Sequence, residues 1–262
     1  MGPIQVLGIL MRDTTQAYPL AQLEALLGRH GIRVHILNDG LPVEQLDVVI
    51  AMGGDGTVLR ALDLMPGCPV LAINFGTVGF LTAGESSELE SLVARLLARD
   101  YLVSERLLLR CRHPWGTSHV VNEVVLRSSW RLMNVDVYVN DAKIRTIRGD
   151  GLILGTPTGS TGYLLSTGAP LVMPDVNCFI LDGINEYNFT SRALILSPES
   201  RIRLHIPQLL EKQRAELFID GNPVGELTPG QELHLDRSER RVQLIFFEKN
   251  YFFHNLSSRL SW

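Results

Sequence analysis

A change in the spacing of apolar segments near residue 100 constrains the fold of this chain most. Before it, apolar runs typical of buried strands alternate with stretches that carry apolar residues at helical spacing. The predicted strands are 4–10, 32–37, 46–52 and 68–74, and the predicted helices are 18–31, 57–65 and 87–100. Strands and helices in alternation predict a parallel sheet with helices on its faces.

After residue 100 the apolar runs become short and closely spaced, and turn residues separate them. The run NVDVYVN at 134–140 alternates apolar and polar residues, as a half-buried strand does. Only 161–172 has a partly helical pattern in this half. An antiparallel sandwich is predicted from the runs at 106–112, 119–127, 133–141, 151–157, 192–198, 201–206, 214–221 and 231–236.

We therefore expect an α/β N-terminal domain with a parallel sheet at 1–100 and an all-β sandwich at 101–240. The last segment, 241–262, begins with a strand pattern and ends with an apolar helical pattern. A chain of 262 residues is long enough to bury a core in one large domain or in two small ones.

Composition argues against several classes of protein. The net charge of -4 argues against a general nucleic-acid partner. No signal peptide is evident, and no apolar run reaches the roughly 18 residues of a membrane span. We therefore expect a cytoplasmic protein with no membrane partner. Three widely spaced cysteines, without CxxC or HExxH motifs, argue against a disulfide framework, a structural zinc site and a zinc protease.

The stretch MGGDGTVLRA, residues 52–61, joins a predicted strand to a predicted helix. It matches neither the phosphate loop that ends in GK[ST] nor the GxGxxG fingerprint. Its glycines still allow a ligand to approach the backbone, and Thr57 is a candidate cap for a helix that faces an anion. Asp55 would repel phosphate, so it fits better as a general base or as the partner of a bound metal. The alternative is a tight turn with Asp55 in solvent.

A second stretch, residues 148–170, is rich in glycine, serine and threonine. Small hydroxyl side chains and exposed amides line polar pockets, and Tyr163 offers a flat surface for an aromatic base. A helix is expected to begin near Ser160 or Thr161. The alternative is a surface loop with good turn chemistry.

Asn122 and Glu123 interrupt a run of β-branched residues. Asparagine is suited to an adenine edge because it donates and accepts a hydrogen bond together. Glutamate accepts hydrogen bonds from ribose hydroxyls. The alternative is a strand that ends in solvent, and these two residues alone favour that alternative.

Together these stretches resemble the NAD kinase family. The resemblance lies in GGDGT at 53–57, NE at 122–123 and DGLIxxTPTGSTxY at 150–163. Weaker likeness extends to INFGTVGFLT at 73–82, DGN at 220–222 and the final Leu-Ser-Trp. GGDGT alone is shared with lipid kinases and relatives of phosphofructokinase, whereas the TPTGST block combined with the upstream NE pair is much more specific.

The resemblance implies an α/β domain followed by a β-sandwich, with the last segment returning to the first domain. It implies transfer of a phosphoryl group from ATP, or polyphosphate in some members, to the 2′-hydroxyl of the adenosine ribose of NAD. The product is NADP. Mg²⁺ or another divalent cation would be held mainly by the donor phosphates, with no direct protein ligand. NAD and ATP are the implied partners of a homodimer or homotetramer that binds NAD partly across a subunit interface.

The resemblance also implies roles for particular residues. Asp55 would be the catalytic aspartate, which either accepts the 2′-hydroxyl proton or positions this hydroxyl together with the metal. Asn122 would contact adenine, Glu123 the ribose, and Asp150 the nicotinamide side. ATP phosphates would lie against Gly53, Gly54, Gly56, Thr57 and Arg60. The implied NAD-binding set is Gly56, Asn122, Glu123, Asp150, Thr161, Tyr163 and Ser166, with Arg148, Glu186 and Asn222 as further candidates.

The segment 181–196 departs from the family pattern. The family has a proline- and histidine-rich stretch there, and this chain has LDGINEYNFTSRALIL. In the family this segment approaches the nicotinamide half of NAD and the neighbouring subunit, so Glu186 is expected to alter the charge at that place. Gly162 also stands where many members have alanine.

Two other functions share part of this pattern. A lipid or sphingoid-base kinase shares GGDGT but leaves the TPTGST block and Asn122-Glu123 unexplained. A non-catalytic NAD(P)-binding module on the same fold would have no need of Asp55.

Overall fold

The computed structural model describes residues 2–11, 17–37, 45–76, 79–188 and 191–260. It divides into two compact units, one of residues 1–105 with 242–262 and one of residues 106–241. None of the helices in these described stretches has the length and apolar composition needed to span a membrane.

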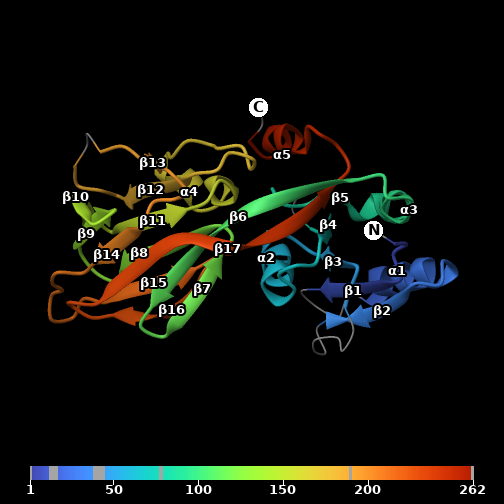
Figure 1. Ribbon diagram of the computed structural model, residues 1–262, viewed down its shortest axis with the longest axis horizontal. Coiled ribbons are helices and arrows are strands. Elements are labelled where there is room, and N and C mark those ends of the chain that lie inside the picture. Colours follow the sequence, from blue (N-terminus) through green and yellow to red (C-terminus); the bar gives the residue numbers. More distant parts are fainter. Residues whose placement is uncertain (1, 12–16, 38–44, 77–78, 189–190, 261–262) are drawn as a thin grey trace. The chain divides into compact units, whose positions relative to one another are not determined.

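The first unit is built on a parallel sheet, as predicted. The strands β1 (Val6–Met11), β2 (Arg33–Ile36), β3 (Val48–Met52) and β4 (Val70–Asn74) lie in the order β2-β1-β3-β4, and Figure 1 shows the first three side by side. The end of β17 (Glu232–Phe246) adds a parallel strand beside β4, with Leu244 opposite Val70. The two-residue β5 (Gly84–Glu85) also pairs with β4.

Helices α1 (Ala17–Arg29) and α3 (Leu89–Ala98) bury apolar residues against these strands. In α3 the buried positions are Leu89, Leu92, Val93 and Leu96, which recur at helical spacing. The short turn η2 (Ser86–Glu88) precedes α3. Helix α2 (Asp55–Leu64) follows β3, and α5 (Tyr251–Leu260) follows β17.

The second unit is an all-β sandwich, as predicted. One sheet has the order β10-β9-β14-β17, and β6 pairs with β17 and with β7. The bounds of its strands are β6 Leu102–His113, β7 Gly116–Val120, β9 Met133–Val139, β10 Ala142–Gly149 and β14 Ile202–His205. The other sheet is antiparallel, in the order β13 (Leu194–Leu196), β12 (Phe179–Ile184), β11 (Gly151–Gly155), β8 (Glu123–Ser128), β15 (Ala215–Ile219), β16 (Asn222–Leu227).

The sandwich core takes alternate residues from both sheets, for example Val135 and Val137 of β9 and Leu152 and Leu154 of β11. A separate apolar cluster lies on the other face of β11. In it Ile153 of β11 lies with Ile180 of β12 and with Leu164 of the short helix α4 (Leu164–Thr167). Strand β11 is therefore buried on both faces, which explains its continuous apolar run.

Besides the two-residue β5, three strands were not predicted from the sequence. Strand β10 is polar and largely exposed, β12 contains Asp182 and Gly183, and β16 contains Pro223 at a sheet edge. Charge, glycine and proline all weaken a strand pattern, although edge strands such as β10 and β16 tolerate charge and proline.

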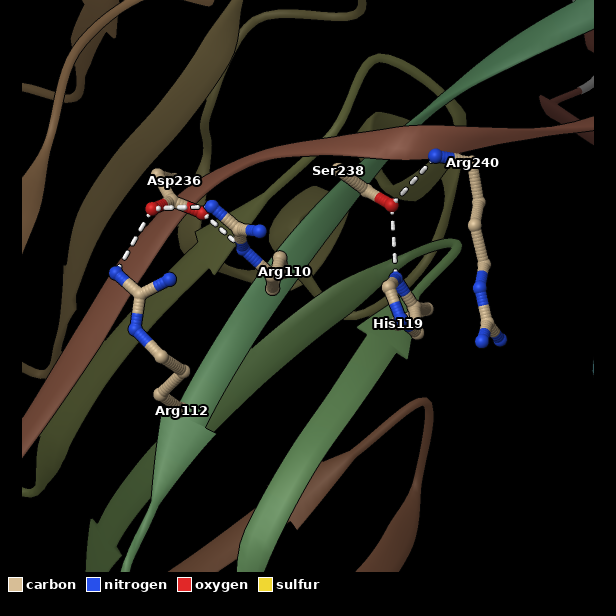
Figure 2. A network of polar contacts seen from close by, with 6 residues as sticks. All are labelled: Arg110, Arg112, His119, Asp236, Ser238 and Arg240. Carbon is tan, nitrogen blue, oxygen red and sulfur yellow. Dashed lines mark hydrogen bonds and ion pairs between the residues drawn. The ribbon is translucent and has the colours of Figure 1, made fainter.

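Strand β17 continues through the charged run DRSERR, where the sequence predicted two separate strands. Cross-strand contacts support this middle section (Figure 2). Arg110 donates two hydrogen bonds to Asp236, at 2.7 and 2.9 Å, and Arg112 donates a third at 2.8 Å. Further along, a ring nitrogen of His119 lies 2.8 Å from the Ser238 hydroxyl. Paired charges thus replace apolar contacts here.

Replacing Phe179 with alanine should destabilise the second unit by about 3–5 kcal/mol, because this fully buried ring fills the sandwich core. Ile195→Ala, on the next strand and 53% exposed, is the matched control and should cost little. Unfolding of both variants followed by urea titration checks this difference. Equal losses in the two variants would show that the core does not lie where we place it.

Candidate active site

The GGDGT turn runs from the end of β3 into α2. The Gly53 amide donates a hydrogen bond to Ile73 at 3.0 Å. A Cβ at position 53 would lie 2.3 Å from the Thr57 hydroxyl oxygen, so this position requires glycine. The helix begins at Asp55 with Gly54 as its N-cap and without a side-chain cap.

The prediction that Thr57 caps this helix is therefore wrong. Thr57 is the third residue of α2, and its amide donates to Gly54 at 2.9 Å. Its hydroxyl oxygen is buried and has no hydrogen-bond partner among the described residues.

A pocket of about 330 Å³ opens at this end of α2. It is lined by Met11, Gly54, Gly56, Thr57 and Arg60. A Cβ at either glycine would meet open space, so glycine here leaves room for a ligand. The first-turn amides, the positive end of the helix dipole and the Arg60 guanidinium all favour an anion.

The Asp55 carboxylate is held by the protein. Its two oxygens accept hydrogen bonds from the amides of Phe80 and Leu81, each at 3.0 Å. A Cβ at Gly79 would lie 1.9 Å from one of these oxygens, so only glycine permits this approach. From α5, Asn255 donates to the carbonyls of Phe80 and Thr82 at 2.9 and 3.2 Å. The alternative of an Asp55 that is merely solvated on a turn does not hold.

In the second unit, Asn122 and Glu123 lie at a break between β7 and β8, where the sequence predicted one run. The amides of Val121, Asn122 and Glu123 all donate to the carboxylate of Asp220, at 2.8, 2.7 and 3.1 Å. Asp220 belongs to the DGN turn between β15 and β16. The strand thus ends at this point, and a single aspartate satisfies its freed amides.

The TPTGST block packs directly on this break. The Thr156 amide donates to the Asn122 carbonyl at 2.9 Å, and the Thr156 hydroxyl donates to Val121 at 2.5 Å. A Cβ at Gly159 would lie 2.2 Å from the Asn122 carbonyl oxygen. A Cβ at Gly162 would lie 2.7 Å from Glu123 Oε2. Glycine at these positions lets the two segments touch.

The helix expected near Ser160 begins later than predicted. Residues Thr158–Thr161 form a 3₁₀ turn, η3, and α4 follows at Leu164. The Thr161 hydroxyl donates to the Thr158 carbonyl at 3.1 Å within this turn.

Two acceptor atoms at the break are buried without a hydrogen-bond partner among the described residues, Asn122 Oδ1 and Glu123 Oε2. Burial raises the pKa of Glu123 to about 8, and the negative charge of Asp220 adds to this, while a hydrogen bond from the Tyr163 backbone opposes it. The Glu123 carboxyl is therefore largely protonated at neutral pH. Buried polar atoms without partners are uncommon, which makes the break a candidate for part of a binding site.

Tyr163, 41% exposed, lines two pockets. The first, about 580 Å³, also includes Ser166, Asp182 and Glu186. The second, about 410 Å³, also includes Asp150, whose carboxylate accepts a hydrogen bond from Asn185 at 2.8 Å. The two pockets therefore place Asp150, Ser166 and Glu186 around the Tyr163 side chain.

The Glu186 carboxylate has a hydrogen-bond partner and a positively charged neighbour. Its Oε2 accepts a hydrogen bond from Ser191 at 2.6 Å and lies 3.6 Å from a nitrogen of Arg145. The Arg145 guanidinium thus pairs with the negative charge that this departure from the family pattern introduces.

The structure does not bring Arg148 and Asn222 to these pockets. Arg148 lines a different cavity, together with Leu132 and Gln213, and stacks on Tyr187 with 5.3 Å to the ring centroid. Asn222 is exposed, and its amide lies 3.3 Å from the Asp220 carbonyl.

Sequence reasoning missed the supporting residues Gly79, Asn255, Asp220 and Arg106. Arg106 is 2% exposed, and its Nη1 lies 3.3 Å from the Thr158 hydroxyl within the TPTGST block. An arginine in a strand run is ordinarily exposed, so nothing in the sequence marks this one as buried. For Asp220, the likeness of DGN to a family turn was the available signal.

In the described stretches, no group of three or more His, Cys, Asp and Glu side chains lies close enough to hold a metal ion.

The first unit has an anion-favouring helix end, and the sandwich has polar pockets around an exposed tyrosine. Both features are compatible with a nucleotide-dependent phosphotransferase. Comparisons with known proteins give the particular family. The ATP-NAD kinase N-terminal domain matches residues 35–101, and the ATP-NAD kinase C-terminal domain matches residues 121–247. The NAD kinase of Geobacter metallireducens is 32% identical over 98% of this chain and 93% of its own length. The chain belongs to the NAD kinase family, and its activity is the phosphorylation of NAD to NADP.

Other similar proteins agree with this assignment. The bifunctional NADP phosphatase/NAD kinase of Methanocaldococcus jannaschii is 35% identical over 87% of this chain, which spans 40% of that protein's length. The structure of an NAD kinase from Archaeoglobus fulgidus in complex with ATP has a TM-score of 0.80 and 26% identity, over 97% of this chain and 99% of that one. Yeast NADH kinase complexed with NADH shares the fold, with a TM-score of 0.90 and 23% identity over 100% of this chain and 89% of that one. The lipid kinase and the non-catalytic module are set aside.

The raised pKa of Glu123 predicts how stability depends on pH. Between the ordinary value of 4.5 and about 8 the folded protein keeps a proton that the unfolded chain releases, so stability falls as pH rises through this window. Glu123→Gln cannot ionise and lacks this contribution. Melting temperatures measured across this window should fall more for the wild type than for Glu123→Gln. Parallel curves would contradict the buried, protonated carboxyl.

Proposed function

We propose that this NAD kinase transfers the γ-phosphoryl group of ATP to the 2′-hydroxyl of the adenosine ribose of NAD, with Asp55 as the proton acceptor. The observation that carries the proposal is the fixed Asp55 carboxylate beside an anion-favouring pocket at the start of α2. The Archaeoglobus fulgidus relative solved with ATP supports ATP as the donor.

Asp55 has the acceptor capacity that this role requires. A carboxylate offers about four lone-pair sites, and the amides of Phe80 and Leu81 use two of them. A free site accepts the hydroxyl proton while the ribose oxygen forms its bond to the γ-phosphorus and the bond to the bridging oxygen of ADP breaks. Held by two amides, the carboxylate needs little reorganisation for this step.

The donor phosphates would lie in the α2 pocket. The backbone at Gly54 and Gly56 lets them approach, and Thr57 and Arg60, which also line this pocket, would add a hydroxyl group and a positive charge. Gly53 would contribute indirectly, by allowing the turn to pack on Thr57. A divalent cation, Mg²⁺ in the first instance, would be held mainly by these phosphates near Asp55 and would offset the repulsion between phosphate and carboxylate.

In the second unit, the two buried acceptors fit the adenosine half of NAD. Asn122 Oδ1 would accept from the adenine amino group, and a protonated Glu123 both donates to and accepts from ribose hydroxyls. Tyr163 offers a stacking surface, and Asp150, Thr161 and Ser166 would hold the remainder of the dinucleotide. Glu186, held by Arg145, would lie at the edge of this site. A homodimer or homotetramer, which the family resemblance implies, belongs to the same proposal.

Asp55→Asn should lower the turnover number by about 10²–10⁴-fold, because the amide cannot take the proton, while the KM for NAD changes little. Asp63→Asn, an exposed aspartate on the same helix, is the matched control and should keep full turnover. Steady-state formation of NADP from NAD, ATP and Mg²⁺ measures both. Undiminished turnover in a folded Asp55→Asn would remove Asp55 from the mechanism.

A further inference from the structure

The break between β7 and β8 depends on one distant carboxylate. In a regular strand successive amides point to opposite sides, so three in a row cannot reach one acceptor. Here the amides of Val121, Asn122 and Glu123 all reach Asp220, which shows that the backbone is kinked around its carboxylate.

Asp220 is itself held in place. Its amide donates back to the Glu123 carbonyl at 3.0 Å, so four hydrogen bonds join this residue to the break. Its φ of +47° lies in the left-handed region, followed by Gly221 at +78°. Aspartate tolerates this conformation better than most residues, and the turn aims its carboxylate at the break.

Asp220 acts on the site only through its neighbours. Asp220, like Asn122 and Glu123, is not among the residues that line the two pockets around Tyr163, and its carboxylate accepts from the backbone amides of the break. Asn122 and Glu123, whose backbone it holds, present the two buried acceptors that have no partner among the described residues. Moving the Asn122 carbonyl would also disturb its hydrogen bond to Thr156 and its close contact with Gly159.

We propose that Asp220 is a positioning residue for the acceptor substrate, which sets the backbone pose from which Asn122 and Glu123 bind the adenosine half of NAD. The inference rests on the proposed function of those two residues. Asp220 does not touch the reacting atoms, so its loss should weaken NAD binding and leave ATP binding unchanged.

The charge of Asp220 provides a second readout. The negative charge of Asp220, in the β15–β16 turn, lies close enough to Glu123 to raise its pKa. On the other side of Glu123, the uncharged Gly155 and Gly162 approach it closely, and the Tyr163 amide donates a hydrogen bond to it. Because this charge adds to burial in raising the pKa of Glu123, its removal should move the pH dependence of NAD binding to lower pH. A change in fold stability alone would not cause that shift.

The test compares Asp220→Asn and Asp220→Glu in the full chain. Asp220→Asn replaces one acceptor oxygen with an NH₂ group, and Asp220→Glu keeps the charge but displaces it by one methylene. Both should raise the KM for NAD about tenfold or more, with the KM for ATP unchanged, because hydrogen bonds to a charged group are lost or misplaced. Only Asp220→Asn should move the pH dependence of the KM for NAD to lower pH. This shift should vanish when Glu123 is also replaced by glutamine.

Asp141→Asn is the matched control, since Asp141 also has a positive φ, at +67°, in a hairpin turn of the same unit. Its KM values should equal those of the wild type. A folded Asp220→Asn or Asp220→Glu with an unchanged KM for NAD overturns the inference. If Asp220→Asn fails to fold, Asp220→Glu decides. A wild type that forms no NADP would instead overturn the proposed function, so the two failures are distinguishable.

Discussion

Backbone amides that lose their strand partners must find other acceptors, and the candidate site depends on how two aspartates meet this need. Asp55 accepts from two amides of the 79–82 loop, and Asp220 accepts from three amides at the β7–β8 break. A buried amide without a partner costs roughly 1–3 kcal/mol. These two carboxylates therefore hold in place the loops that carry the candidate site. This structural role is separate from the catalytic role proposed for Asp55.

Glycine serves the same end by allowing segments to touch. A Cβ at position 79 or 159 would lie 1.9 or 2.2 Å from an atom of another segment, and a Cβ at position 53 would lie 2.3 Å from Thr57 in the same turn. Gly54 and Gly56, in contrast, face open space at the α2 pocket. The glycines of the GGDGT motif thus divide into one that the packing requires and two that keep the pocket open. At 159 and 162, glycine lets the TPTGST block rest on the Asn122–Glu123 backbone.

The sequence predicts the fold classes well, because periodicity reports burial directly. The parallel sheet and the sandwich follow from the alternating patterns, and the resemblance points to the family. Polar edge strands such as β10 and β16 leave weak patterns, and cross-strand ion pairs at Asp236 let β17 run through a charged segment. The role of Asp220 was not predictable because its partners lie 97–99 residues away. Thr57 was mistaken for a cap because the N-cap is Gly54, three positions earlier.

The proposed function assigns ATP to the first unit and NAD to the second, and transfer between them gives one defined product. Phosphorus NMR of the product formed from NAD and ATP by the purified chain tests it most directly. We predict a new phosphomonoester on the adenosine ribose, attached at the 2′ position, with ADP formed in equal amount. A product phosphorylated at another hydroxyl, or ATP hydrolysis without transfer to NAD, would contradict the account.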